Sequence, residues 1–96
     1  MYAQFLLFKT APGKRAEAEK LADQAFAVLK NAKGFKTVMY FGDSDSNEYC
    51  SLYVWETKED LEAVSKEFMP KMQEATKALA IEPPFRRIYE VYEPKI

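Results

Sequence analysis

The segment EYCSLYVW at residues 48–55 predicts a strand that is apolar on both faces. Because side chains alternate along a strand, one face carries an aromatic set and the other an aliphatic set. The aromatic face comprises Tyr49, Ser51, Tyr53 and Trp55, and the aliphatic face comprises Cys50, Leu52 and Val54. A chain of 96 residues can cover one face of a sheet with a single layer of helices. The other face needs a second sheet, for which we predict the sheet of an identical subunit.

The rest of the chain predicts three further strands and two helical regions. Alternating side chains indicate strands at residues 2–9, 35–41 and 85–93. Helical spacing starts near Pro12 and stops before Gly34, which fits a C′ glycine, and the polar turn GDSDSN joins strands two and three as a hairpin. Thr57 and Asp60 resemble a capping box at the start of the second helical region. Pro70 lies inside that region and favours two shorter helices.

The element order is therefore βαββαβ, which predicts a ferredoxin-like α+β fold. In this fold a four-stranded antiparallel sheet carries both helices on one face, and residues 1–96 form a single domain. The uncovered face is apolar here. We therefore expect a homodimer formed through that face of the sheet.

Composition excludes several classes of partner. The net charge is -1, and Lys and Arg are mixed with Asp and Glu rather than gathered into a stripe, so we expect no nucleic-acid partner. The apolar start of the chain is too short for a membrane span or a signal peptide, so we expect no membrane partner and a cytoplasmic location. Cys50 has no second cysteine to pair with, and we predict that it acts as a small hydrophobic residue.

The usual residues of metal and acid–base chemistry are scarce. With no histidine and one cysteine, a zinc site, a His-ligated haem and a His base are not available. Asp43, Asp45 and Asn47 imitate the start of a calcium loop, but Glu48 and Val54 stand where that loop needs Gly and a bidentate Glu. We therefore predict no metal and no cofactor.

Aromatic and basic residues are the remaining candidates for a site. All six tyrosines fall in predicted strands, where they can line an interface or a cavity. Arg86 and Arg87 are adjacent and so point to opposite faces of the last strand; one of them could anchor an anionic or enolic ligand, and the sequence does not choose between them. A base would have to be a tyrosine, a carboxylate such as Glu90, or water.

Four segments of the chain resemble the antibiotic biosynthesis monooxygenase (ABM) family of the dimeric α+β barrel superfamily. They are PGKRAEAEKLADQ, AKGF, YVWETKEDLEAV and EPPFRRIYEVYE, and the resemblance covers nearly the whole chain. It implies that the Trp55 side of the sheet faces the helices and lines a pocket inside each subunit. It also implies that Cys50, Leu52 and Val54 face the sheet of the partner.

The family includes cofactor-free oxygenases of quinols and anthrones, haem-degrading enzymes and an isomerase. The haem-degrading members pair such a Trp with a His on the next helix and an Asn on the first strand, where this chain has Ser65 and Leu6. The resemblance therefore implies a cofactor-independent monooxygenase acting on a small hydrophobic aromatic, such as a quinol or enol. The alternative is a non-catalytic small-ligand-binding or stress-associated dimer that uses the same pocket.

The predicted site residues follow from this interpretation. Trp55, Tyr53 and Arg87 are the predicted catalytic residues, acting as donors to an oxyanion. The predicted substrate-binding residues are Gln4, Leu6, Ser65, Phe68 and Met72.

Overall fold

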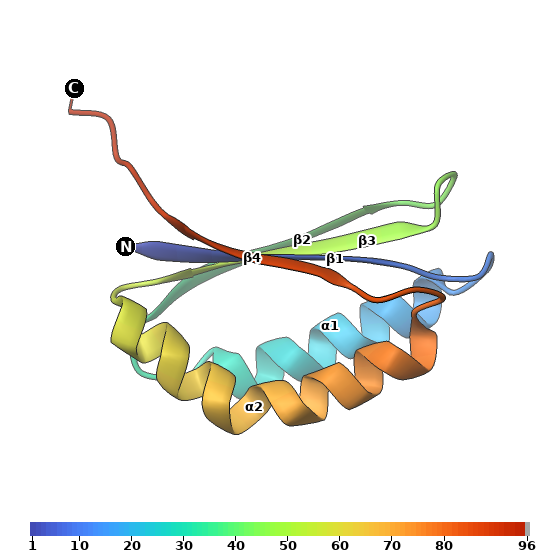
Figure 1. The fold of residues 1–96 in the computed structure, drawn as a ribbon, viewed down its shortest axis with the longest axis horizontal. Coiled ribbons are helices and arrows are strands. Elements are labelled where there is room, and N and C mark those ends of the chain that lie inside the picture. The colour runs from blue at the N-terminus through green and yellow to red at the C-terminus, as the bar shows by residue number, and fades with distance from the viewer. Residues whose placement is uncertain (96) are drawn as a thin grey trace.

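The chain folds as one antiparallel sheet with two helices packed against one face (Figure 1). The computed structural model describes residues 1–95. The elements are β1 (Tyr2–Lys9), α1 (Arg15–Leu29), β2 (Phe35–Asp43), β3 (Glu48–Trp55), α2 (Lys58–Leu79) and β4 (Phe85–Glu90). The strand order is β2-β3-β1-β4, so the predicted ferredoxin-like fold is confirmed.

Strand β1 lies inside the sheet and pairs with both β3 and β4. Residues directly opposite one another in antiparallel strands point to the same face. Leu6 lies opposite Ser51 of β3 and Arg86 of β4, and Ser51 in turn lies opposite Tyr40 of β2. One row of side chains therefore crosses all four strands on the face that the helices cover. We call this row, Tyr40, Ser51, Leu6 and Arg86, the cross-strand row.

The core lies between this face and the helices. Trp55, at 2% exposure, is its largest fully buried side chain, and Leu29 and Leu61 of the two helices pack in its cluster. A second cluster forms around Phe8, Ala18 and Leu21. The predicted division of β3 is thus confirmed, because Ser51, Tyr53 and Trp55 are buried and the alternate residues are not.

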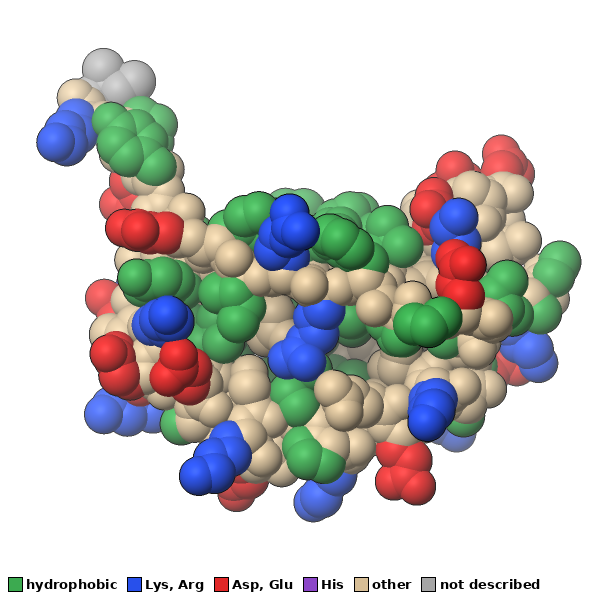
Figure 2. All heavy atoms as spheres, viewed as in Figure 1, with side chains coloured by type: hydrophobic (Ala, Val, Ile, Leu, Met, Phe, Trp, Pro, Cys, Tyr) green, Lys and Arg blue, Asp and Glu red, His purple; other side chains and the backbone are tan. Residues whose placement is uncertain are grey.

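The opposite face of the sheet is apolar and lies away from the helices. Phe5 contacts Phe41 on one side and Phe85 on the other, with ring centroids 6.5 and 6.0 Å apart. Met39 and Phe41 of β2 are 62% and 46% exposed. Figure 2 shows hydrophobic side chains gathered along the top of the sheet, opposite the helices. We call this surface the bare face.

Pro70 does not divide the second helical region. The prediction of two helices is wrong, because α2 runs from Lys58 to Leu79 with Pro70 inside it, and Figure 1 shows it curving beneath the sheet. Pro70 is exposed, as is Lys66 four residues earlier. The Lys66 carbonyl, which loses its helical N–H donor, can therefore be hydrated, and the helix bends without ending.

Gly34 is not the C′ residue of α1. That helix ends at Leu29 with Lys30 as C-cap, so the predicted C-cap is wrong. Gly34 has φ +81° and lies in the turn into β2, where its carbonyl accepts a hydrogen bond from Glu56 N at 2.7 Å. An added Cβ would collide with the Asp60 side chain. Glycine is needed there for backbone conformation and for space.

Other local predictions hold with small changes of boundary. The β2–β3 hairpin is confirmed, and β4 ends at Glu90, earlier than predicted. Thr57 caps α2, with Oγ1 accepting from Asp60 N at 3.1 Å and donating to the Asp60 carboxylate at 2.9 Å. Neither helix within residues 1–95 is long and apolar enough to cross a membrane.

Replacing Pro70 with alanine should stabilise the protein. Pro70→Ala restores a backbone donor to a continuous, exposed stretch of α2, and we expect the free energy of unfolding to rise by about 1–3 kcal/mol. Urea unfolding followed by Trp55 fluorescence measures the change. Lys71→Ala, at the next exposed position, is the control and should stay within about 0.5 kcal/mol of the parent. A destabilised Pro70→Ala would contradict the continuous helix.

Candidate functional site

A cavity of about 630 Å³ lies between α2 and the covered face of the sheet. Strands β1, β3 and β4 supply its ceiling, α2 its floor, and the connector between α2 and β4 its rim. We call it the main cavity. Its lining includes Gln4, Leu6, Leu29, Tyr53, Trp55, Val64, Ser65, Phe68, Met69, Met72, Thr76, Ile81, Pro83, Pro84 and Arg86. The lining is mostly apolar with a few polar groups, which is the usual character of a small-ligand site.

Seven of the eight predicted site residues line the main cavity. Gln4, Leu6, Tyr53 and Trp55 reach it from the sheet, and Ser65, Phe68 and Met72 reach it from α2. The strand residues share the covered face because they are two positions apart on each strand and the register aligns the strands. The helix residues share one side of α2 because they are three or four positions apart. The eighth, Arg87, lies elsewhere.

Arg87 points to the bare face. Arg86 occupies the position in the main cavity that was predicted for Arg87. The Arg87 guanidinium lies 5.4 Å from the Phe85 ring centroid, and its cross-strand partner is Phe5. Arg86 belongs to the cross-strand row and lines the main cavity. The choice of Arg87 is therefore corrected: strand alternation separates the two arginines, and the register of β4 against β1 decides which one faces inward.

Arg86 and Gln4 form the polar centre of the main cavity. With the Gln4 amide oxygen facing the guanidinium, Gln4 Oε1 accepts from Arg86 Nε and Nη2 at 2.7 Å each. Gln4 is only 7% exposed, and burial lowers the pKa of Arg86. Within residues 1–95 Arg86 has no ion pair. A half-buried positive charge without a counterion favours an anionic ligand.

Trp55 contributes its indole ring to the main cavity. Its Nε1–H is buried and has no hydrogen-bond partner among the described residues, although Trp N–H groups usually find one when buried. Trp55 lines the main cavity together with Arg86. The indole ring thus contributes apolar surface to the cavity, while its N–H is enclosed by the protein.

The hydroxyls of Tyr40 and Tyr53 lie 2.8 Å apart, and the two rings meet edge to face. Burial, followed by this hydrogen bond, raises the pKa of Tyr40 well above its usual range. Burial also raises the pKa of Tyr53. Both hydroxyls therefore stay protonated at neutral pH and act as donors or acceptors of hydrogen bonds rather than as bases.

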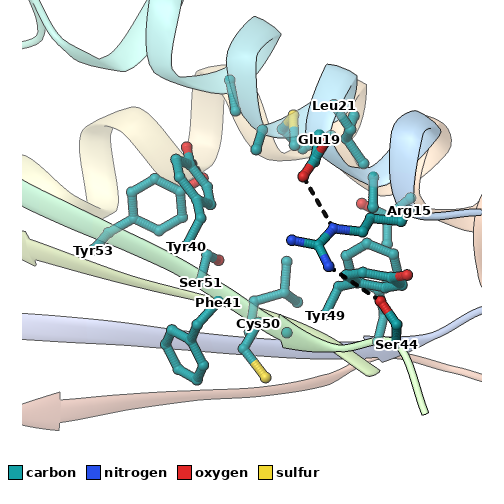
Figure 3. Close-up of a pocket in the computed structure, with 18 residues that line it drawn as sticks. Arg15, Glu19, Leu21, Tyr40, Phe41, Ser44, Tyr49, Cys50, Ser51 and Tyr53 are labelled. Carbon is teal, nitrogen blue, oxygen red and sulfur yellow. Dashed lines mark hydrogen bonds and ion pairs between the residues drawn. The ribbon is translucent and has the colours of Figure 1, made fainter. Parts of the chain in front are cut away.

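A smaller pocket of about 180 Å³ lies beside the main cavity, between α1 and the β2–β3 hairpin (Figure 3). Tyr40, Tyr49, Ser51 and Tyr53 line it from the sheet. At one end Arg15 contacts Glu19 at 3.2 Å and Ser44 Oγ at 3.3 Å. Ser51 is 5% exposed, and its Oγ has no partner in the described part of the chain. We call it the side pocket.

The sequence and the fold match known proteins. A family model described as antibiotic biosynthesis monooxygenase matches residues 1–78. This chain belongs to the antibiotic biosynthesis monooxygenase family. The ABM domain thus accounts for most of the molecule. No curated protein sequence matches the chain significantly.

Solved structures share the fold of this ABM domain at low sequence identity. Rv0793 from Mycobacterium tuberculosis has a TM-score of 0.82 at 12% identity, covering 99% of this chain and 98% of that one. SnoaB from Streptomyces nogalater, a cofactor-independent oxygenase, scores 0.79 at 18%, covering 98% and 95%. The ActVA-Orf6 monooxygenase of Streptomyces coelicolor, in complex with Nanaomycin D, scores 0.76 at 16%, covering 99% and 90%. These likenesses show the fold.

The ABM domain offers little to a metal ion. No group of three or more His, Cys, Asp or Glu side chains within residues 1–95 could hold one. Ser65 and Leu6, the residues at the positions where haem-degrading relatives have His and Asn, both line the main cavity. Neither side chain ligates iron readily.

Three polar contributors to the site were not predicted as such. The sequence presents Tyr40 only as one of six strand tyrosines, does not single out Thr76 of α2, and offers Arg86 as an alternative to Arg87. Thr76 lies one turn after Met72 on α2, and Tyr40 bonds Tyr53 across the β2–β3 hairpin, so the orientation of the helix and the register of the hairpin bring them to the site. The hairpin register pairs Tyr40 with Ser51, and that pairing is the one signal that could have placed it.

The Tyr40–Tyr53 pair should make the ABM domain sensitive to alkaline pH. Both folded pKa values lie above the ordinary value of 10.0, so the protons that the pair holds stabilise the fold below about pH 10, and this stabilisation falls as pH rises further. Tyr40→Phe should cost about 1 kcal/mol at pH 7, because Tyr53 loses its partner, and should flatten the alkaline decline. Urea unfolding across pH 7–11 measures both effects.

Tyr92→Phe is the matched control, since Tyr92 is 74% exposed in the segment after β4. It should follow the parent protein at every pH. An unchanged alkaline decline in Tyr40→Phe would show that other groups cause it.

Proposed function

We propose that this protein is a cofactor-independent monooxygenase that oxidises a small hydrophobic aromatic, a quinol or enol, in the main cavity. The observation that carries the proposal is the Arg86 guanidinium, which lines an apolar cavity and has no counterion within residues 1–95. SnoaB is described as a cofactor-independent oxygenase and ActVA-Orf6 as a monooxygenase, and both share this fold. Their likeness supports the reaction class.

Arg86 would act on the ionised substrate. A quinol anion gives up electrons to oxygen more readily than the neutral quinol, and a nearby positive charge in an apolar site favours the ionised form. Gln4 orients the guanidinium through its two bonds of 2.7 Å. Trp55, Leu6, Phe68 and Met72 would pack against the ring of the substrate.

The reaction needs no external reductant. The quinol anion passes an electron to O₂, and the resulting radical couples with superoxide to form a carbon–oxygen bond. The oxygen–oxygen bond then breaks with loss of water, and the product is a hydroxyquinone. One quinol and one O₂ thus give one hydroxyquinone and one water, and the substrate supplies every electron. The protein supplies the apolar cavity and the donors.

The general base is water in this proposal. Tyr53 holds its proton, and Glu90 is exposed and does not line the main cavity. Glu82 lines the rim, where its carboxylate lies 3.9 Å from Lys9 Nζ. Substrates that ionise easily would therefore be favoured, because Arg86 lowers the pKa of a bound quinol hydroxyl instead of a side chain removing the proton.

Oxygen uptake tests this function. The purified protein, supplied with a panel of reduced benzo- and naphthoquinones, should consume oxygen faster than the buffer blank and yield hydroxyquinone. Arg86→Gln should lower kcat/KM roughly ten- to a hundredfold, the loss expected for a charge-assisted hydrogen bond. Arg87→Gln is the control, the same change at the next residue but on the bare face, and should retain activity once its assembly is checked. Uptake equal to the blank across the panel would refute the oxygenase.

We also infer that two copies pair through the bare face. Phe5, Met39, Phe41 and Phe85 give that face a continuous apolar surface, which a second copy can bury. The segment after β4 leaves the sheet on the same side, away from the helices, and carries the exposed Tyr92 (Figure 1). It would lie against the partner.

A charge in the bare face should separate the copies. Leu52 lies opposite Phe5 and Met39, so Leu52→Glu would place a carboxylate in the middle of the interface. Size-exclusion chromatography with light scattering should report a dimer for the parent and a monomer for the variant. Val28→Glu, at an apolar residue of α1 that is 56% exposed, should remain dimeric. A folded, monomeric parent at micromolar concentration would refute the pairing.

The second candidate is a non-catalytic binder of the same ligands, which is favoured because no carboxylate within residues 1–95 pairs with Arg86. A thermal-shift screen with the oxidised quinones separates the two functions. A ligand that raises Tm while its reduced form is not turned over supports binding alone.

A further inference from the structure

We propose that the side pocket binds molecular oxygen and delivers it to the main cavity. The inference rests on the oxygenase function proposed for the main cavity, and it adds a binding place and a route of entry for the second substrate. Dioxygen is small, neutral and apolar. A site for it therefore needs an apolar interior, a mouth that the quinol does not use and a thin wall toward the quinol.

Oxygen needs a path to the quinol that the quinol does not itself obstruct. The rim of the main cavity is the connector between α2 and β4, with Ile81, Pro83 and Pro84. A quinol that enters past this rim and lies against Arg86 occupies that opening. A second opening would let oxygen arrive while the quinol stays in place.

The interior of the side pocket is apolar. Its carbon surface comes from β1 and α1, through Phe8, Ala18, Leu21, Ala22 and Ala25. All of these except Ala22 are buried. An apolar cavity of about 150 Å³ binds xenon, and the side pocket has a volume of about 180 Å³. A space that takes xenon also has room for O₂, which is likewise apolar.

The hydroxyl groups around this interior offer little to water. The Tyr40 and Tyr53 hydroxyls lie 2.8 Å apart and bond one another. Ser51 Oγ is enclosed by protein atoms and presents no surface to the pocket. A water molecule held in a cavity needs several polar partners, whereas an apolar gas needs none. The interior therefore suits O₂ better than an ordered water.

The two ends of the side pocket lead in different directions. At one end the Arg15 and Glu19 side chains are 68% and 63% exposed, and Arg15 reaches Ser44 of the hairpin turn (Figure 3). These exposed side chains mark the outer mouth. The Tyr40–Tyr53 pair lies at the other end in Figure 3, and Tyr53 also lines the main cavity. The pocket thus runs from solvent toward the quinol.

The wall between the two spaces is one side chain thick. Leu6, Tyr53, Met72 and Thr76 line both of them. Met72 is unbranched and flexible, and methionine adapts readily to the shape of a neighbour. A change of its rotamer would open the wall to a molecule of two atoms without moving the backbone.

Charge keeps the two substrates in their own spaces. Arg86 lines the main cavity and not the side pocket, so an ionised quinol is held on its own side of the wall. In the side pocket the Arg15 guanidinium is compensated by Glu19 at 3.2 Å. No unpaired charge there attracts an anion, and O₂ has no charge to be repelled.

Xenon is the probe for binding. Methyl groups labelled with ¹³C are followed by NMR as xenon pressure rises, with an oxidised quinone in the main cavity. The shifts of Ala18 and Ala25 should saturate in the parent protein. In Ala22→Phe this response should vanish, because the ring fills the space. Ala27→Phe is the matched control, since it makes the same change at an exposed position of α1 outside both spaces, and it should keep the response.

The oxygen dependence of turnover tests delivery. With quinol saturating, Ala22→Phe should lower kcat/KM for O₂ roughly three- to tenfold, since oxygen then reaches the ring only past the rim. Its kcat/KM for the quinol at high O₂ should match the parent value, because the main cavity is unchanged. Ala27→Phe should match the parent protein in both. Ala22→Leu fills less of the pocket and should give a smaller loss in the same direction, which guards against a folding defect in the larger variant.

The inference is overturned if xenon gives no saturable shift at Ala18 and Ala25, or if Ala22→Phe leaves kcat/KM for O₂ unchanged. It is also overturned if Ala22→Phe lowers kcat/KM for the quinol, because the side pocket would then hold part of the quinol. Quinol consumption is a separate measurement. If quinols are consumed while xenon avoids the side pocket, the oxygenase stands and the oxygen site falls. If xenon binds there while no quinol is consumed, the gas-binding pocket stands, and delivery falls together with the oxygenase.

Discussion

Because β1 lies between β3 and β4, the register of its two pairings decides which polar side chains meet under the sheet. Leu6 opposite Ser51 and Arg86 places both on the covered face, and a slip of one residue in β4 would exchange Arg86 for Arg87. The site thus depends on backbone hydrogen bonds more than on any contact between the site residues themselves.

The two helices also set the electrostatic environment of the side chains on the covered face. They bury Trp55 and raise the pKa of Tyr40, while leaving Arg86 half-buried without a counterion. Tyr53 holds its proton, Glu90 lies outside the main cavity, and Glu82 lies at its rim near Lys9. What the cavity offers is positive charge and N–H donors in apolar surroundings, an arrangement that suits a ligand able to ionise and react with oxygen by itself.

Much of this could be predicted because it is periodic. Alternation in β3 separated the aromatic face from the aliphatic one, and spacing in α2 placed Ser65, Phe68 and Met72 together. The predictions of a helix break at Pro70 and of a C-cap at Gly34 were wrong for the same reason. Proline and glycine have real local preferences, but the exposure of the helix face at Pro70 and the closeness of Asp60 to Gly34 depend on packing.

By itself the sequence determined the order of elements, the two-sided character of the sheet and most of the cavity lining, because these depend on residues near one another in the chain. Only the tertiary structure decided that Arg86 rather than Arg87 faces inward, that Tyr40 bonds Tyr53, and that Gln4 accepts from Arg86. Those facts depend on strand register and on helix packing between distant segments, and neither is encoded in a local pattern.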